Sequence, residues 1–176
     1  AGATKLDLKG EGLTELPEEI WGLADTLEVL DIGNNKLTTL PPNMHRLKRL
    51  RIIFLSGNPM SEVPPSLGEC PELTMIGMRG CGVTRVPPQS LPPKLQWFIL
   101  TDNKITELPK ELGGCVNLQK LMLAGNQLTS LPDSMSACKN LELIRLSANR
   151  FQTLPKFLLT LPKLAWLALS ANPLTE

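Results

Sequence analysis

Apolar residues recur along this chain with a period much longer than that of a helix or a strand. In the stretch 118–140, apolar residues stand at positions 1, 4, 6, 11 and 14, asparagine at position 9 and proline at position 15. The pattern starts eight times, 22 to 24 residues apart, at Ala3, Leu27, Leu50, Leu73, Leu95, Leu118, Leu141 and Leu164. A constant period of this size is typical of a solenoid, in which each repeat stacks on its neighbours.

Each repeat is predicted to supply one short strand and one return segment. The alternation around positions 4 and 6 sends leucines to one side of the strand and the residues between them to the other. Strands at a spacing of ~4.8 Å would form one parallel sheet. Because the return segments carry bulky apolar residues and short helical, 3-10 or extended turns, they need more width than the strands. The sequence therefore predicts an α/β solenoid, a right-handed horseshoe whose curved parallel sheet lies uncovered on the concave face.

One return segment is expected to differ from the others. The fourth repeat has only 22 residues, and its segment 89–95 contains Pro92 and Pro93. Proline lacks a backbone N–H and restricts the residue before it. We therefore expect segment 89–95 to be extended, without a helix.

Asparagine at position 9 is predicted to have a structural role. Inward-facing amides can satisfy loop backbone groups that have no partner in the sheet. Cys81 takes this position in the fourth repeat, and its weakly donating thiol should loosen one rung of the ladder. The asparagines of the ladder are Asn35, Asn58, Asn103, Asn126, Asn149 and Asn172.

The repeats fill the chain as a single domain, 1–176, whose eighth repeat is partial. Solenoids need terminal caps with a polar outer face, and neither end carries a recognisable one. We therefore expect this sequence to be part of a longer protein. We also expect no signal peptide, since the first repeat begins directly at Ala3.

Composition argues against several partners and locations. Lysine and arginine number 18 against 17 acidic residues, and the isoelectric point is near 7.9, whereas a nucleic-acid-binding domain would be basic. No apolar run approaches the ~20 residues of a membrane span. Cys70, Cys115 and Cys138 share a repeat position that Leu47 and Leu161 fill elsewhere, as expected of buried hydrophobes. Without disulfide or metal spacing, we predict reduced thiols in a cytoplasmic protein.

No residue pattern indicates catalysis, a metal ion or a cofactor. His45 is the single histidine, and no cysteine, serine or carboxylate stands at a meaningful spacing from it, so we expect it to be solvated. The glycine-rich and serine motifs of nucleotide-binding proteins and hydrolases are absent. We therefore predict that this chain is not an enzyme and binds neither metal nor cofactor.

Opposite charges are grouped in consecutive repeats. Seven acidic and no basic residues lie within 11–31, and five basic and no acidic residues lie within 36–51. Because these repeats stack, we expect exposed ion pairs worth about 0–1 kcal/mol each. The alternative is an anionic-ligand site on the outer side, built on Arg46, Lys48 and Arg49.

The open side of the predicted sheet is where we expect function. Side chains at positions 3, 5 and 7 point outward from it. Position 5 carries the large apolar residues Phe54, Ile99 and Met122, and position 7 is mostly small, which lets a partner approach. The residues predicted to bind a partner are Asp31, Ile52, Phe54, Met75, Arg79, Trp97, Ile99, Lys120, Met122, Arg145 and Trp166.

The apolar strip on this side is near the size at which exposed patches become meaningful. From Ile52 to Trp166 it crosses five strand spacings and covers roughly 300 Å². A standard interface buries ~800 Å² per partner, so charged neighbours such as Asp31 and Arg145 must supply a rim. The alternative is that the apolar side chains merely pack on one another.

The repeats resemble those of intracellular leucine-rich repeat proteins of the Leu-Pro type, among them polarity and Ras-pathway scaffolds and plant relatives. The resemblance implies a binding protein without catalysis. It rests on the pairs Leu16-Pro17, Leu40-Pro41, Val63-Pro64, Val86-Pro87, Leu108-Pro109, Leu131-Pro132 and Leu154-Pro155.

Three stretches resemble more narrowly the repeat regions that precede a protein kinase domain in bacterial, algal and plant leucine-rich repeat kinases. They are 91–103, 118–126 and 161–173, of which the short proline-rich one is the most specific. The chain has no His-Arg-Asp or Asp-Phe-Gly, so no catalytic residue of that family has a counterpart here.

We therefore predict a protein-interaction module that binds a protein or peptide through its concave face, with the kinase domain of a parent protein involved in signalling as one candidate partner. Two alternatives stay open at this point. In the first alternative, the chain is a structural spacer that binds nothing through this face. In the second, it is a ligand-binding domain that uses the outer basic patch.

Overall fold

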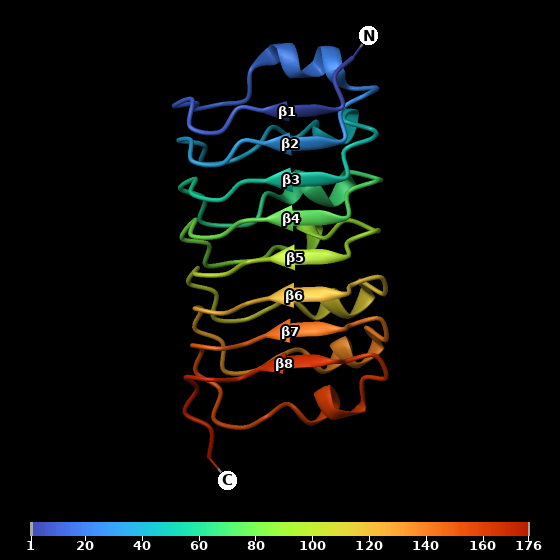
Figure 1. Cartoon of the computed structure of the whole chain (residues 1–176). Helices are drawn as coiled ribbons and strands as arrows, with labels where there is room; N and C mark the ends of the chain where they lie inside the picture. Colours follow the sequence, from blue (N-terminus) through green and yellow to red (C-terminus); the bar gives the residue numbers. More distant parts are fainter. Residues whose placement is uncertain (1, 176) are drawn as a thin grey trace.

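The computed structural model describes residues 2–175, and each of its repeats forms a strand at the third to fifth positions. The strands are β1 (Lys5–Asp7), β2 (Val29–Asp31), β3 (Ile52–Phe54), β4 (Met75–Gly77), β5 (Trp97–Ile99), β6 (Lys120–Met122), β7 (Leu143–Arg145) and β8 (Trp166–Ala168). They form one eight-stranded parallel sheet in sequence order. Figure 1 shows this ladder with the return segments behind it. The predicted α/β solenoid is confirmed.

Successive strands pair without any shift of the repeat register. Leu30, for example, pairs with Leu6 on one side and Ile53 on the other, which hold the same repeat position. A slip of one residue would turn the apolar side chains onto the open face. The alternation in the sequence therefore sets the register, and the middle residues of β2 and β3, Leu30 and Ile53, are 0% exposed.

The return segments form 3-10 helices. They are η1 (Glu18–Leu23), η2 (Met44–Arg46), η3 (Pro65–Glu69), η4 (Pro88–Ser90), η5 (Lys110–Gly114), η6 (Asp133–Ala137) and η7 (Lys156–Thr160). Proline precedes the first helical residue in six of these seven helices. Its fixed φ suits an extended N-cap, and its missing N–H removes no bond of the helix. Within residues 2–175, none of the helices has the length and apolarity needed to cross a bilayer.

The expectation of an extended segment at 89–95 is wrong at its start. Pro88–Ser90 form η4, a single turn that is shorter than η3 or η5. Pro88 allows this turn because it stands at the first helical position, where no N–H bond is needed. Ser90 is fully buried, and its hydroxyl donates to the carbonyl oxygen of Pro87 at 2.6 Å. The short repeat therefore closes with a shortened helix.

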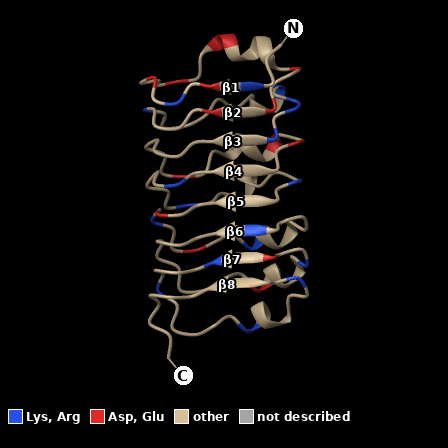
Figure 2. Cartoon of the chain, in the orientation of Figure 1, with Lys and Arg blue, Asp and Glu red and all other residues tan. Residues whose placement is uncertain are grey.

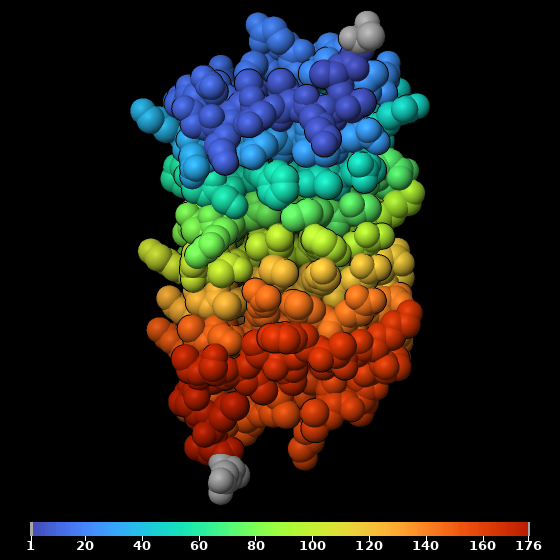
Figure 3. Space-filling model, viewed as in Figure 1, coloured from blue at the N-terminus to red at the C-terminus, as the bar shows by residue number. Residues whose placement is uncertain are grey.

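The core is a continuous row of side chains that runs through all repeats. Leu50, Leu73 and Leu95 hold the same position in successive repeats, and each is 0% exposed. The cysteines are free and buried in the same row, with Cys70 and Cys138 at 0%. In Figure 3 the repeats appear as colour bands that follow one another without a break. Each inner repeat is therefore stabilised by contacts with both neighbours.

The last repeat buries less of its apolar surface than the inner ones. Leu164 and Leu167 are only partly buried, whereas Leu141 and Ile144 at the same positions of the preceding repeat are 0% exposed. Trp166 on β8 is 59% exposed. An inner repeat therefore owes part of its burial to the next repeat in the stack.

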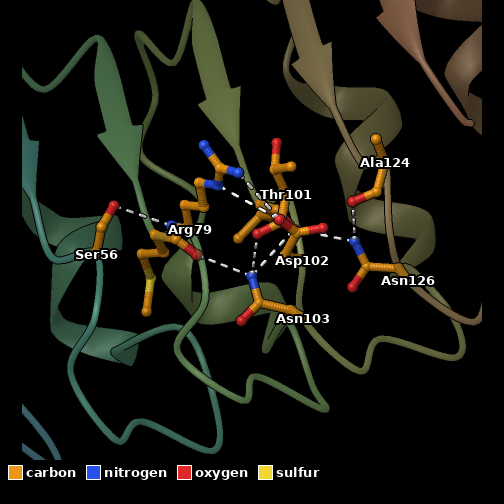
Figure 4. Close-up of polar contacts among 9 residues, drawn as sticks. Ser56, Arg79, Thr101, Asp102, Asn103, Ala124 and Asn126 are labelled. Carbon is orange, nitrogen blue, oxygen red and sulfur yellow. Dashed lines mark hydrogen bonds and ion pairs between the residues drawn. The ribbon is translucent and has the colours of Figure 1, made fainter. Parts of the chain in front are cut away.

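Asparagine side chains connect consecutive repeats behind the strand ends. The Nδ2 of Asn126 donates to the carbonyl oxygens of Leu100 at 2.9 Å and Leu123 at 3.0 Å. Its Oδ1 accepts the N–H of Ile105 at 3.1 Å, and the residue is only 6% exposed. Asn103, shown beside it in Figure 4, likewise donates to carbonyls of its own and of the preceding repeat. Each of these asparagines therefore holds the backbone turn of the preceding repeat in place.

Cys81 supplies fewer links at the same position. Its thiol donates to the carbonyl oxygen of Leu55 at 3.3 Å, a bond that an asparagine would also make. The N–H of Met60, which an asparagine Oδ1 would accept, bonds instead to the carbonyl oxygen of Asn58 at 2.9 Å. This rung therefore lacks one connection between repeats.

Position 8 of every repeat has a positive φ. Glycine fills it four times, at Gly10, Gly57, Gly80 and Gly125, and the other occupants are Asn34, Asp102, Ala148 and Ala171. A left-handed conformation costs most residues roughly 1–2 kcal/mol, whereas asparagine and aspartate tolerate it better. Ala148, with a φ of 57°, has no such compensation.

Candidate functional site on the concave face

The outward side chains of β1–β8, at repeat positions 3 and 5, form one uncovered surface with the position 7 residues, two places after each strand, and we call this surface the concave face. All residues predicted to bind a partner lie on it, from Asp31 on β2 to Trp166 on β8. Because neighbouring strands are in register, side chains at one repeat position form a column across the sheet. The face therefore brings residues of seven strands onto one surface.

The three strands in the middle of the concave face carry no charged residue, and Arg79 lies on the same face two residues beyond the end of β4. In Figure 2 the arrows of β3, β4 and β5 are free of charged residues, whereas β2 carries Asp31, β6 carries Lys120 and β7 carries Arg145. An apolar centre therefore lies between an acidic residue on one side and two cations on the other.

A hollow of about 180 Å³ opens at the amino-terminal ends of β3–β5. It is lined by Ile52, Thr74, Met75, Gln96 and Trp97. This volume is about six times the ~30 Å³ that a water molecule occupies in the liquid. The prediction missed Thr74 and Gln96 because they precede the strands, outside the positions 3, 5 and 7 that mark the outward side chains. The hollow is large enough for one apolar side chain of a partner.

The apolar column at position 5 is less exposed than its sequence suggests. Phe54, Ile99 and Met122 were expected to be uncovered, but all three are half-buried. A Cβ built on Gly77 would lie 3.0 Å from Cδ1 of Phe54, so this ring lies over Gly77. The strip is thus partly packed on itself, and its free apolar area is smaller than expected.

Arg79 is already bound by neighbouring repeats. Its Nη2 lies 3.3 Å from Oδ2 of Asp102, and its backbone N–H donates to Oγ of Ser56 at 3.0 Å, as Figure 4 shows. The sequence analysis missed Asp102. The spacing of 23 residues between Arg79 and Asp102 could have indicated the pair, because residues one repeat apart lie on adjacent turns of the solenoid. The charge of Arg79 is therefore compensated within the chain.

Lys120 and Arg145 have no carboxylate partner within residues 2–175. The Nζ of Lys120 lies 4.0 Å from the ring centroid of Trp97, which is a cation–π contact. Arg145 is exposed at the end of β7. Together with the exposed Trp166, these residues make the later part of the face positively charged and aromatic.

Two of the three cations of the outer basic patch contact side chains of the preceding repeat, and one of these contacts is an ion pair. The guanidinium carbon of Arg46 lies 4.8 Å from the ring centroid of Trp21, and Nζ of Lys48 lies 3.9 Å from Oδ1 of Asp25. Arg49 is the third cation of this patch and is exposed. The acidic and basic blocks thus meet in the stack, as expected for mutual neutralisation. Among the described residues, Arg46 and Arg49 have no carboxylate partner, so the alternative of an anionic ligand at this patch stays open.

The histidine and the thiols offer no evident chemistry. His45 is exposed, as expected, and its Nδ1 lies 3.5 Å from Oε2 of Glu69, a neighbour that the sequence analysis did not identify. The stack brings these residues together from consecutive repeats. Burial raises the pKa of Cys70 to about 12 and that of Cys115 to about 11, which keeps both thiols protonated and unreactive. No metal-binding cluster of His, Cys, Asp or Glu occurs within the described residues.

A stack of similar repeats with one open parallel sheet defines the chain as a solenoid repeat protein. The family profile for the leucine rich repeat matches residues 2–60 and 116–174, and a profile for two copies of the repeat matches 93–134. The chain belongs to the leucine-rich repeat family. Domains of this family are generally protein-interaction modules, and their fold is typically non-enzymatic. No curated protein matches the chain closely in sequence.

Solved structures share this fold at low sequence identity. Internalin C2 from Listeria monocytogenes is 25% identical with a TM-score of 0.80, over 98% of this chain and 74% of that one. The plant peptide hormone receptor RGFR1, solved in complex with RGF2, is 27% identical with a TM-score of 0.77, over 96% and 28%. A leucine-rich repeat protein of Leptospira interrogans is 25% identical with a TM-score of 0.60, over 97% and 61%. The chain thus spans less than two thirds of the Leptospira protein and of the receptor.

Proposed function

We propose that this chain binds a protein or peptide partner through its concave face. The observation that carries the proposal is the uncharged strip across β3–β5, which no other layer of the fold covers. Contiguous apolar surface rimmed by polar groups marks interaction sites. Aromatic and arginine side chains near such a centre supply much of the binding energy.

The residues of the face have different roles in this proposal. Phe54, Ile99 and Met122 supply flat apolar contact, and the hollow beside Trp97 receives a side chain of the partner. Position 7 is small in most repeats, so a partner's backbone can approach the sheet closely. Arg145 belongs to the polar rim, where charge steers association and selects among partners.

One of the similar structures supports the hypothesis that the partner is a peptide. The plant receptor is a peptide hormone receptor, and its structure was solved in complex with RGF2. The shared fold over 96% of this chain makes a peptide partner our first hypothesis here. The identity of 27% carries no residue-level assignment.

Comparative capture from source-cell lysate tests this proposal. The wild-type chain and the variant Phe54→Glu, Ile99→Glu, Met122→Glu are used as baits, and thermal melting verifies that both are folded. We expect proteins captured by the wild type to be absent or at least about tenfold depleted with the variant, because buried unpaired carboxylates oppose binding. If the triple variant unfolds, the single variant Met122→Glu replaces it.

A matched control places the same charge away from the concave face. Val116→Glu, Ala137→Glu and Leu159→Glu change exposed residues on other sides of the repeats. This control variant is expected to capture the same proteins as the wild type. If the concave variant captures the wild-type set, or the wild type captures nothing, the proposal fails and the spacer hypothesis gains support.

A narrower hypothesis is that the partner is a protein kinase domain and that the chain is its regulatory or targeting region. Its support is the short proline-rich repeat at 91–103, which resembles repeats that precede such domains. The same capture experiment tests it, because protein kinases should then be enriched among the proteins lost with the concave variant. A set of face-dependent partners without any kinase would contradict it.

A further inference from the structure

Positive charge on the concave face is compensated in one place and free in another. Arg79 is paired with Asp102 at 3.3 Å. Lys120 and Arg145 form no ion pair within residues 2–175. Glu142, the carboxylate closest to Arg145 in sequence, pairs with neither. Any partner that covers the later strands therefore meets two uncompensated cations.

The two cations are close enough to bind one acidic group together. Lys120 pairs with Leu143 and Met122 pairs with Arg145, so the cations occupy diagonal positions on adjacent strands. From the strand spacing and the rise per residue, their Cβ atoms lie about 8 Å apart. Both side chains are long and flexible, and a single carboxylate between them can accept hydrogen bonds from each.

The surroundings of the two cations are apolar, which makes a counter-charge necessary when the face is covered. Lys120 stacks on Trp97 at 4.0 Å, and Met122, Leu143 and Trp166 lie beside the cations on the same strands or the next. A partner that excludes water here without a negative group would leave buried charges unpaired, which is strongly unfavourable. The chemistry of the face therefore selects an acidic partner.

The apolar hollow lies at a defined distance from these cations. Its centre is near β4, about two to three strand spacings, or ~12 Å, from the midpoint between β6 and β7. An extended chain that runs across the strands covers this distance in roughly four residues. One peptide segment can thus reach both places at once.

We infer that the partner segment is an extended acidic peptide: an apolar side chain enters the hollow beside Trp97, and an Asp or Glu about four residues away lies between Lys120 and Arg145. This inference rests on the proposed function, since it names the chemistry of the partner of the same face. Net attraction by the exposed Arg145 and the half-buried Lys120 also predicts faster association at low salt and weaker binding at high salt.

Selection from a display library of short random peptides tests the inference. The wild-type chain is the bait, and clones that also bind the Phe54→Glu, Ile99→Glu, Met122→Glu variant are removed. We expect the remaining peptides to be enriched in Asp or Glu near an apolar residue. Their affinity should fall at least about tenfold for the variant Lys120→Glu, Arg145→Glu, and less when salt is high.

The variant Lys5→Glu, Lys9→Glu is the matched control, because it changes net charge by the same amount on the same face, next to β1. It should keep the wild-type affinity. Face-dependent peptides without acidic enrichment, or equal losses in both charge variants, would overturn the inference while leaving the proposed function intact. A library that yields no face-dependent peptide would count against the proposed function itself.

Discussion

At the residue scale, one repeat position decides how firmly consecutive turns are held together. Asn126 donates to carbonyls of two repeats and accepts one N–H, whereas Cys81 donates to backbone carbonyls and accepts no N–H bond within the described residues. The difference follows from chemistry alone, because an amide both donates and accepts strongly and a thiol does neither. The stability of a repeat therefore depends on which residue fills position 9.

The first prediction compares these two rungs. Asn126→Ala leaves buried backbone groups of two repeats without partners and should lower the free energy of unfolding by about 2–4 kcal/mol. Cys81→Ala should lower it by only about 1 kcal/mol, because a thiol behaves mainly as a small hydrophobe. Denaturant unfolding measures both. Equal losses would mean that the amide bonds do not hold the stack together.

The second prediction concerns the left-handed position 8. Ala148 has a φ of 57°, so Ala148→Gly should raise the free energy of unfolding by roughly 0.5–1 kcal/mol. Ala124 is not among the positive-φ residues, and Ala124→Gly should lower stability by a similar amount. If both substitutions lower stability, the backbone strain assigned to Ala148 is absent.

The third prediction concerns the thiol of Cys70. Burial, and secondarily the charge of Glu69, raise its pKa from 9.0 to about 12. In the unfolded chain the thiol ionises around pH 9, so this contribution to stability is complete below pH 9 and disappears as the pH rises toward 12. At pH 9 we expect alkylation of Cys70 by iodoacetamide to be at least ~100-fold slower in the folded chain than in denaturant. Similar rates would show an accessible, ionised thiol.

At the element scale, close packing of neighbouring 3-10 helices distinguishes two adjacent glycines of η5. A Cβ on Gly113 would collide with the backbone carbonyl of Ser134 in η6, whereas a Cβ on Gly114 would contact nothing within 4 Å. The glycine at position 113 therefore lets the helices of two repeats approach each other.

The fourth prediction uses this pair. Gly113→Ala should destabilise the chain by about 1–3 kcal/mol because η6 must shift. Gly114→Ala should change stability by less than ~0.5 kcal/mol, as for most surface substitutions. Thermal and denaturant melting compare the two variants. A tolerated Gly113→Ala would indicate that the return segments pack more loosely than described.

At the scale of the whole molecule, the repeat period predicted the fold because it specifies the same strand and the same buried positions in each turn. It could not predict that Phe54 is half-buried, since this depends on the missing side chain of Gly77 in the next repeat. It also missed η4. Pro88 stands at the first helical position and can start a helical turn, whereas the prediction considered only Pro92 and Pro93, which prevent the turn from continuing. The open face was predictable from the alternation, whereas the pairing of Arg79 with Asp102 depends on side-chain geometry between turns.

The central claim is that a partner contacts the concave face and not the outer side. Site-specific photo-crosslinking tests it most directly, with p-benzoylphenylalanine placed at Ile99 on β5 in one sample and at Leu159 on η7 in another. Both samples are irradiated in source-cell lysate, and covalent adducts are identified by mass spectrometry. The account predicts discrete protein adducts from position 99 and none of the same proteins from position 159. Adducts from position 159 alone, or no adducts from position 99, would contradict it.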